Sequence, residues 1–480
     1  MSKHPFKGEP RPHQIRALKK AWPHNEFAFF HAMRSGKTYT TINLAAARFL
    51  KDQIDGLVII CPTPLKAVWV RELEQWCPVD VSTFVVAAGC KKRFERWHGL
   101  EIILSRLDVM IVGIEALSQG QAHLMVHDFL KSHNCMTVID ESTGIKNAQS
   151  GRTKKCFDIG GLSEYRLILT GTPVTQGLHD LYAQMMFLNA KILGCKSYFV
   201  FKNRYCVMGG FQGKKILGYQ FEDDLMAKIG NNIDQVTKEE AMPNLPANDY
   251  DSLTVDLTKE QTAAIKTLKD EMAAVQGDNV LTVATIMEQL TRYQQIIGGN
   301  FPFDDGTGNY EVEPIRGVNP KLAALLDHLS VADTSTKFII WARFRPELAA
   351  ISDALASAFG EESLVQFHGG IDDEGRSDAS LRFQSDDSVR FMVSNQTVGG
   401  KGQEWSAADA MVYFSNTFSY EDRKQSEERA IHTDKRTSIF YLDIIANHPA
   451  DKMITTALKK KLTMAEWVED QLDEGKEIEL

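Results

Sequence analysis

Two stretches of the chain alternate short apolar runs with segments of helical pattern. In the first 190 residues five such runs occur, and they are Phe27–Phe30, Leu57–Cys61, Asp108–Val112, Thr137–Asp140 and Arg166–Thr170. Short runs rich in β-branched and aromatic residues, separated by helix-length segments, are typical of βαβ units and a parallel sheet. We therefore predict a first α/β lobe over residues 1–190.

The same alternation returns near the carboxyl end. The predicted strands there are Lys337–Trp341, Ser363–Phe367, Arg390–Ser394, Ala410–Phe414 and Ser438–Leu442. They predict a second α/β lobe over residues 321–480.

The intervening residues 191–320 have a different character and predict a helical extension and linker. The pattern over about 177–300 is mostly helical, with a long helix at Val280–Gln295 and a glycine-rich interruption at Met208–Gly213. Asn300–Pro320 is rich in Gly, Asp, Asn and Pro, which is typical of a linker. The tail from Glu466 carries seven acids against one lysine, so we expect a solvated helix or a frayed end.

The composition places the chain among globular proteins. Of 480 residues, 43% are hydrophobic and 24% charged, which excludes collagen-like, mucin-like and wholly disordered classes. The sequence has no run of about 20 apolar residues, so we expect no membrane span. The first residues are polar, so we expect no secretory signal. The seven scattered cysteines form no C-x-x-C pair, which argues against a zinc ribbon or a disulfide framework. We expect a cytoplasmic protein with thiols that are mostly buried, in the host cytoplasm if it is phage-encoded.

The net charge of −9, from 54 basic and 63 acidic residues, means that any nucleic-acid surface must be a local patch. Four basic runs are candidates, and each also fits a solvated surface: Lys91–Arg93, Lys154–Lys155, Lys214–Lys215 and Lys459–Lys461. We favour Lys91–Arg96 and Lys214–Lys215.

A candidate phosphate loop, Ser35-Gly36-Lys37-Thr38, follows a predicted strand and precedes a predicted helix. Backbone N–H groups at such a helix start attract phosphate oxygens, Lys37 can reach the β- and γ-phosphates, and the Thr38 hydroxyl can bind Mg²⁺. The pattern G-x-x-x-x-G-K-[ST] is incomplete because His31 occupies the position of the first glycine. Taken alone, the string also fits a surface turn.

A carboxylate pair, Asp140-Glu141, ends another predicted buried strand. In a magnesium-dependent phosphohydrolase, Asp140 would hold Mg²⁺, and Glu141 would orient and deprotonate the attacking water. Acids at the end of a strand are also common on solvated loops. Together with the phosphate loop, the pair indicates an ATPase.

Further short sequence motifs that accompany the phosphate loop and the carboxylate pair lie along the first lobe. They are Arg11-Pro-His-Gln14, Cys61–Leu65 with Trp69, Gly113–Ser118 and Leu169-Thr-Gly-Thr-Pro173. In this order the chain resembles helicase superfamily two, and specifically Swi/Snf-like ATPases, over about residues 10–445. Its brevity and its Met33-Arg34-Ser35 variant resemble compact phage or bacterial members. The resemblance implies that Gln14 recognises adenine and that Leu169–Pro173 couples hydrolysis to movement.

Four sequence motifs of the second lobe resemble those of the same family. They are Lys337–Arg343, Phe367-His-Gly-Gly370, Val398–Gly402 and Gln425–Ala430. The resemblance implies two RecA-like lobes, ATP and Mg²⁺ as cofactors, and nucleotide contacts from Gly400, Gly402 and Gln425. It also implies that Arg429 is an arginine finger supplied by the second lobe.

Two departures from the family leave the activity open. His432 stands where a second arginine is usual, and Gln403-Glu404-Trp405 replaces apolar residues. Three alternative functions therefore stay open. The first is a monomeric, DNA-stimulated ATPase that acts as a helicase-like motor and translocates on duplex or branched DNA in repair, recombination or replication, with contacts mostly to phosphates. The second is an RNA-acting or strand-separating helicase, and the third is a non-hydrolysing nucleic-acid-binding regulator. Trp69 and Trp341 are expected to be core aromatics.

Overall fold

The computed structural model describes most of the chain, in two compact units, Met1–Pro243 and Asn244–Leu480. The described residues are 4–99, 106–175, 177–209, 215–243, 247–276, 282–304, 310–400, 405–432, 437–460, 462, 464, 467, 468 and 471. The two units divide the predicted middle segment 191–320 between them, at residue 243. Among the described residues, no helix is long and apolar enough to cross a membrane.

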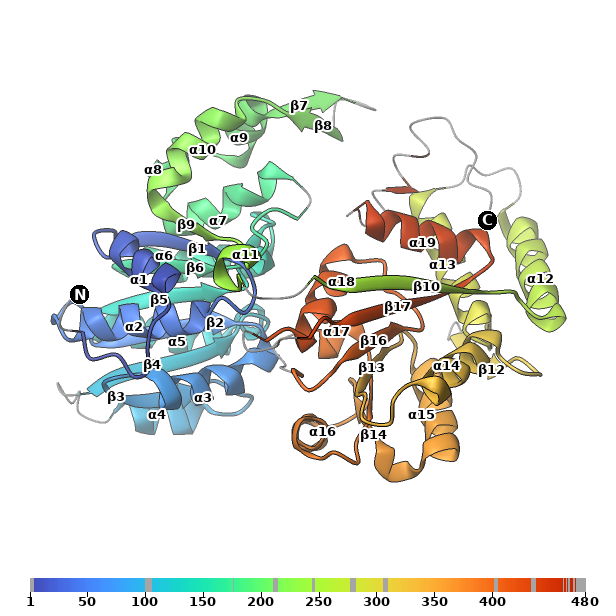
Figure 1. The fold of residues 1–480 in the computed structure, drawn as a ribbon. Helices are drawn as coiled ribbons and strands as arrows, with labels where there is room; N and C mark the ends of the chain where they lie inside the picture. Colours follow the sequence, from blue (N-terminus) through green and yellow to red (C-terminus); the bar gives the residue numbers. More distant parts are fainter. Residues whose placement is uncertain are drawn as a thin grey trace. The chain divides into compact units, whose positions relative to one another are not determined.

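Unit 1 is built on a seven-stranded parallel sheet in the order β3-β4-β2-β5-β6-β1-β9 (Figure 1). Its strands are β1 (Glu26–His31), β2 (Gly56–Cys61), β3 (Asp80–Val85), β4 (Arg106–Gly113), β5 (Cys135–Asp140), β6 (Tyr165–Leu169) and β9 (Ile233–Val236). Helices α1 to α6 are Pro12–Ala21, Lys37–Phe49, Lys66–Trp76, Lys91–His98, Gln121–Ser132 and Gly151–Gly161.

The remaining helices of unit 1 come from residues 181–241. Helices α7 to α11 are Leu181–Leu188, Ala190–Leu193, Tyr198–Tyr205, Glu222–Ile229 and Lys238–Ala241. Between α9 and α10 the antiparallel strands β7 (Cys206–Gly209) and β8 (Lys215–Tyr219) form a hairpin.

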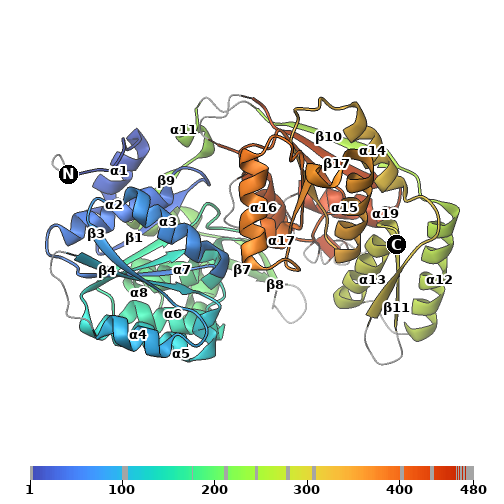
Figure 2. The same ribbon diagram turned by 90° about the horizontal axis from the view of Figure 1, so that it is seen from below.

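Helices cover both faces of this sheet because successive strand residues point to opposite sides. Phe27 and Phe29 of β1 pack with α1, α2 and α3, whereas Ala28 and Phe30 pack in the cluster that includes α5, α6 and α7. Figure 2 shows α2 and α3 on one side of the strands and α4, α5 and α6 on the other. The near-continuous apolar runs of the sequence are therefore strands buried on both faces.

Unit 2 has a six-stranded parallel sheet in the order β10-β17-β16-β13-β15-β14. Its strands are β10 (Asp249–Val255), β13 (Phe338–Trp341), β14 (Leu364–Phe367), β15 (Phe391–Ser394), β16 (Ala410–Tyr413) and β17 (Phe440–Ala446). Helices α12 to α19 are Lys259–Gln276, Val283–Ile297, Pro320–Val331, Arg345–Phe359, Asp373–Ser385, Gln396–Gly399, Tyr420–Glu427 and Pro449–Lys459. The predicted α/β class with two parallel-sheet lobes is confirmed.

The segment predicted as mostly helical is mostly helical, but it also contains strands that the sequence analysis did not predict. Both β9 and β10 lie in it, and each forms an edge of its sheet. Strand β9 has only four residues, and β10 is largely exposed. Edge strands of this kind lack the buried apolar run that identified the central strands.

Two further expectations are corrected in unit 2. The predicted linker Asn300–Pro320 contains an antiparallel hairpin, β11 (Asn300–Asp304) paired with β12 (Tyr310–Pro314). In the acidic tail, Trp467 and Val468 are buried with α13 and α19, so this portion is not solvated. Most of the tail's acids lie outside the described residues.

Candidate functional site

The predicted phosphate loop lies at the carboxyl end of the central strand β1. The loop follows His31, the last residue of β1, and α2 begins at Lys37. The N-cap is Gly36 with φ +82°, so no side chain satisfies the first N–H groups of α2. A Cβ at Gly36 would clash with the Gln14 amide, and the left-handed φ also favours glycine. An uncapped helix start of this kind suits an anion such as phosphate.

Lys37 and Gln14 both contact the backbone of this loop. The ammonium of Lys37 donates to the carbonyls of His31 at 3.0 Å and Ala32 at 3.3 Å. The Gln14 amide donates to the carbonyl of Ser35 at 3.2 Å, and its oxygen accepts from the backbone N–H of Arg11 at 2.8 Å. The structure therefore brings Gln14, Ser35, Gly36 and Lys37 together, with Thr38 in the first turn of α2.

The carboxylate predicted to hold Mg²⁺ lies on the same edge of the sheet. Strand β6 lies between β1 and β5, and the register aligns Phe29 with Leu169 and Leu169 with Asp140. The carboxyl ends of parallel strands share one edge, where ligands bind in open α/β sheets. The phosphate loop and Asp140 thus end neighbouring parts of one sheet, although they are about 100 residues apart in sequence.

Asp140 is buried and accepts two hydrogen bonds. The indole N–H of Trp69 donates to its Oδ2 at 2.9 Å, and the backbone N–H of Glu141 donates to its Oδ1 at 3.0 Å. Burial raises the pKa of the Asp140 carboxyl, while the Trp69 hydrogen bond and the charge of Lys37 act in the opposite direction. Trp69 is a core aromatic, as predicted, and it also orients this carboxylate.

Glu141, the predicted general base, has a left-handed backbone. Its φ is +49°, which is uncommon for a residue other than glycine. The chain turns sharply here at the end of β5, and the side chain is partly exposed. Such conformations occur at active sites when the surrounding structure holds them in place.

A buried glutamine that the sequence analysis missed links this turn to the segment Leu169–Pro173. The Ser142 hydroxyl donates to Oε1 of Gln184 at 2.7 Å, and the Gln184 amide donates to the carbonyl of Pro173 at 2.7 Å. A Cβ at Gly171 would lie 3.2 Å from Cγ of Met33, so this segment also packs against the phosphate loop. Gln184 sits in an apolar helix, and nothing in its sequence context marks it.

His31, which replaces the first glycine of the phosphate-loop pattern, contacts the buried carboxylate of Asp234. Its Nε2 lies 3.0 Å from Oδ2 of Asp234 on the edge strand β9, and Arg16 of α1 contacts the same carboxylate at 3.1 Å. Burial lowers the pKa of His31, and the contacts with Asp234 oppose this shift. Asp234 and Arg16 escaped the sequence analysis because β9 was not predicted.

The residues predicted from the second lobe lie in unit 2. Arg429 is buried, and its Nε donates to the carbonyl of Gln425 at 2.9 Å. The Gln425 amide donates to Glu421 at 3.2 Å. Gly400 follows α17, whereas Gly402 lies outside the described residues. All of these remain predictions as nucleotide contacts.

The residues that replace the usual apolar ones of the family include a buried tryptophan. Trp405 is fully buried, packs 5.8 Å from Trp341 between ring centroids, and donates to the Ser380 hydroxyl at 2.9 Å. It therefore supplies apolar packing itself, and Trp341 is the predicted core aromatic. Gln403 and Glu404 lie outside the described residues.

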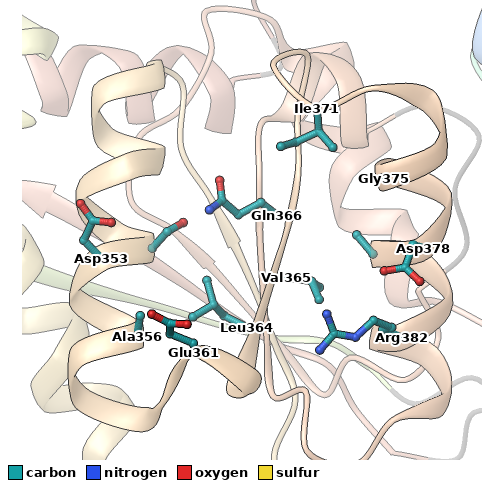
Figure 3. Close-up of a pocket in the computed structure, with 12 residues that line it drawn as sticks. Asp353, Ala356, Glu361, Leu364, Val365, Gln366, Ile371, Gly375, Asp378 and Arg382 are labelled. Carbon is teal, nitrogen blue, oxygen red and sulfur yellow. The ribbon is translucent and has the colours of Figure 1, made fainter.

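Unit 2 also holds a pocket of about 420 Å³ beside its edge strand β14 (Figure 3). Helices α15 and α16 flank it, with Asp353 and Glu361 on one side and Asp378 and Arg382 on the other. None of the predicted site residues lines this pocket.

The four predicted basic runs differ in what they contact. In α4, Arg93 donates to the carbonyl of Val85 at 2.9 Å and packs over Phe84, so it has a structural role. Lys154 and Lys155 are exposed on α6, as are Lys459 and Lys460 at the end of α19. Lys214 and Lys461 lie outside the described residues. The seven cysteines, all within the described part, are buried and unpaired, as expected.

Comparison with known proteins identifies similar sequences and a matching family. Similar curated proteins include a Caenorhabditis elegans homologue of SWI/SNF-related matrix-associated actin-dependent regulator of chromatin subfamily A-like protein 1, 23% identical over 87% of this chain and 56% of its own length. An uncharacterised ATP-dependent helicase of Mycoplasma genitalium is 23% identical over 93% of this chain and 40% of its own. The mouse DNA annealing helicase and endonuclease ZRANB3 is 23% identical over 89% of this chain and 38% of its own length.

The chain thus spans about 38–56% of the length of these relatives. Among solved structures, the Sulfolobus solfataricus SWI2/SNF2 ATPase core in complex with dsDNA is 21% identical with a TM-score of 0.43, covering 96% of this chain and 92% of that one. The SNF2-related domain family matches residues 16–299, which is more than half of the chain. The chain belongs to the SNF2-related domain family.

Proposed function

We propose that this protein is a DNA-stimulated ATPase that moves along duplex or branched DNA. The observation that carries the proposal is the shared sheet edge of unit 1, where the uncapped start of α2 comes after β1 and the buried carboxylate of Asp140 ends β5, with only β6 between these two strands. A phosphate-binding helix start beside an oriented carboxylate is the arrangement that ATP hydrolysis requires. Membership of the SNF2-related domain family supports the same reaction.

The side chains present suit a magnesium nucleotide. Gly36 and Lys37 would hold the phosphates, and Thr38 with Asp140 would hold the metal, because hydroxyl and carboxylate oxygens are ligands that Mg²⁺ prefers. When bound, Mg²⁺ neutralises negative charge on the phosphate oxygens. Glu141 would accept the proton of the attacking water, and Arg429 would stabilise charge on the transferred group.

Duplex DNA is the proposed track because relatives are named as DNA-acting proteins, among them a DNA annealing helicase. Contacts would be mostly to phosphates, so binding would be independent of sequence and sensitive to salt. Repair, recombination or replication is the proposed setting, and a monomer is the proposed working form.

The test is steady-state ATP hydrolysis by the wild-type protein and the Glu141→Gln variant. Each protein is assayed alone and with duplex DNA, single-stranded DNA, branched DNA or RNA. The proposal predicts strong stimulation by duplex or branched DNA that the variant loses. A preference for RNA would favour an RNA-acting helicase, and nucleotide binding without turnover would favour a regulator.

A further inference from the structure

The described residues within 190–221, which are 190–209 and 215–221, form a projection on unit 1 that we name the arm. It comprises α8, α9 and the hairpin of β7 and β8, and Figure 1 shows the hairpin at its far end, beyond the seven-stranded sheet. None of the predicted site residues of unit 1 belongs to the arm. The arm therefore needs an explanation of its own.

The charge of the arm is opposite to that of the rest of the chain. In sequence, residues 190–221 contain six cations and no acid, the cations being Lys191, Lys196, Lys202, Arg204, Lys214 and Lys215, of which Lys214 lies outside the described residues. Three acids, Glu222, Asp223 and Asp224, follow directly, and Arg204 pairs with Asp224 at 3.0 Å. Removing these six from 54 basic residues leaves 48 against 63 acids, or −15, outside the arm. A local positive segment in an acidic protein is the footprint expected of a polyanion-binding surface.

Apolar side chains are exposed on the same segment. Of the fifteen large apolar side chains that are exposed in the described part of the chain, five lie in the arm, Phe199, Val200, Val207, Leu217 and Phe221, and Met226 lies just beyond it on α10. Single exposed apolar residues are normal, but a cluster of this kind marks an interaction site.

Other aromatic residues of the arm already have structural roles. The rings of Tyr182, Tyr198, Phe201 and Tyr205 form a chain with centroids 5.0–5.3 Å apart, which attaches α9 to α7. The Tyr219 hydroxyl lies 2.7 Å from Nδ1 of His179 and anchors the hairpin. The arm is thus held in place without Phe199 or Phe221.

Phe221 is difficult to explain by folding alone. Phe221 is 64% exposed, and its φ is +54°, a left-handed conformation that is strained for a bulky residue. Glycine or asparagine would suit this backbone better, and burial gives the ring no compensation. Phe199 is 72% exposed on α9. Exposed rings near cations, as Phe199 is to Lys196 and Lys202 in sequence, are the means by which proteins stack on unpaired bases.

We infer that the arm binds unpaired bases where a DNA duplex opens into single strands, through Phe199 and Phe221. Its lysines would attract the phosphates, and the two rings would stack on bases that a continuous duplex keeps paired. The inference rests on the proposed function because it adds a preference for forks to a motor on duplex DNA. It can nevertheless be tested without ATP.

The experiment measures fluorescence anisotropy of the full chain with labelled DNA in the absence of nucleotide. The probes are a blunt duplex and a duplex of equal length that carries two unpaired oligothymidine arms. Wild-type protein should bind the forked probe more tightly. The double variant Phe199→Ala/Phe221→Asn should bind the fork about tenfold more weakly or worse, since stacking is strong for each base. Its affinity for the blunt duplex should change less than about twofold.

Two controls separate the inference from misfolding and from the proposed motor. Phe221→Asn alone should unfold at the same temperature as wild type or higher, because asparagine tolerates positive φ. Leu124→Ala, at a 62% exposed position of the same unit, should leave both affinities unchanged. The double variant should keep the ATPase activity that blunt duplex stimulates in wild type. If the proposed function were wrong, the wild-type protein would also lack this activity.

Two results would overturn the inference. One is equal affinity of wild-type protein for the forked and blunt probes. The other concerns the double variant. Its affinity for the fork could be unchanged, as would be found if the arm instead docked a protein. Alternatively, its affinity for the fork could fall only as much as its affinity for the blunt duplex.

Discussion

The indole N–H of Trp69 donates a 2.9 Å hydrogen bond to Oδ2 of Asp140, from a ring that is fully buried. Trp69 lies on α3 and Asp140 at the end of β5, so the bond fixes the carboxylate from a different element. A hydrogen bond to the charged form of an acid lowers its pKa and opposes the effect of burial. The tryptophan thus favours the ionised form of Asp140, which is the form that the proposed metal ligand requires.

Trp69→Phe should move the acidic limb of the pH profile of kcat/KM to higher pH. The phenylalanine keeps most of the packing but lacks the donor, so the pKa of Asp140 rises further and its proton competes with the metal at a higher pH. The profile is measured by DNA-stimulated ATP hydrolysis at saturating Mg²⁺. Trp341→Phe is the matched control, because its indole N–H contacts the Met411 sulfur instead. An identical profile for Trp69→Phe and wild type would contradict the role of this bond.

The central strands were predictable because they are buried on both faces and read as apolar runs. The sequence could also predict Lys37 and Asp140, since Lys37 begins the helix that comes after β1 and Asp140 ends β5. The order of the strands, which makes β1, β6 and β5 neighbours, depends on long-range pairing that no local pattern contains.

The supporting residues were less predictable, for a related reason. Gln184 reaches Ser142 from a helix 42 positions away, and Asp234 reaches His31 from an edge strand 203 positions away. Such buried polar contacts depend on tertiary structure, while the short strand β9 has too few apolar residues to be recognised.

Lys37→Ala should abolish ATP turnover. The ammonium lies at the phosphate loop, where it donates to two carbonyls, and it is the cation expected to bind the β- and γ-phosphates. Hydrolysis is measured with and without duplex DNA, and nucleotide binding is measured with a fluorescent ATP analogue. Lys51→Ala, at an exposed lysine just after α2, is the control and should hydrolyse ATP normally. Substantial turnover by Lys37→Ala would disprove this assignment.

Glu141→Gln should retain nucleotide binding and lose about 10²-fold or more in kcat. The amide preserves the size of the side chain but cannot accept a proton from water, and general bases contribute on this scale. Nucleotide binding and single-turnover hydrolysis are measured on the same preparation. If the variant bound ATP and hydrolysed it at the wild-type rate, another group would have to be the base.

Arg429→Ala should lower kcat by about 10³-fold, the scale expected of an arginine finger. Because Arg429 is buried and bonded to the Gln425 carbonyl, thermal unfolding must be compared alongside the rate. Arg376→Ala in the same unit removes a partly exposed arginine of α16 and should leave the rate unchanged. A loss of thermal stability with normal turnover would make Arg429 a structural residue.

Asp234→Asn should destabilise unit 1 by roughly 1–3 kcal/mol at pH 7, the usual range for weakening a buried charged hydrogen bond. Burial alone would raise the pKa of Asp234, but the hydrogen bonds and charges of His31 and Arg16 prevail and lower it. An acid whose pKa is lowered by folding adds stability above its unfolded pKa of about 3.8 and loses that contribution as pH falls through the lower folded value.

The difference between wild type and Asp234→Asn should therefore be constant from pH 7 to 5 and should narrow below about pH 4. Urea unfolding at a series of pH values measures it. Asp158→Asn is the matched control, because Asp158 is 54% exposed although its Oδ2 lies 2.8 Å from Nε2 of His123. Exposed pairs contribute little, so this control should change stability by less than about 1 kcal/mol. Equal effects of the two substitutions would show that the buried contact between Asp234 and His31 adds no particular stability.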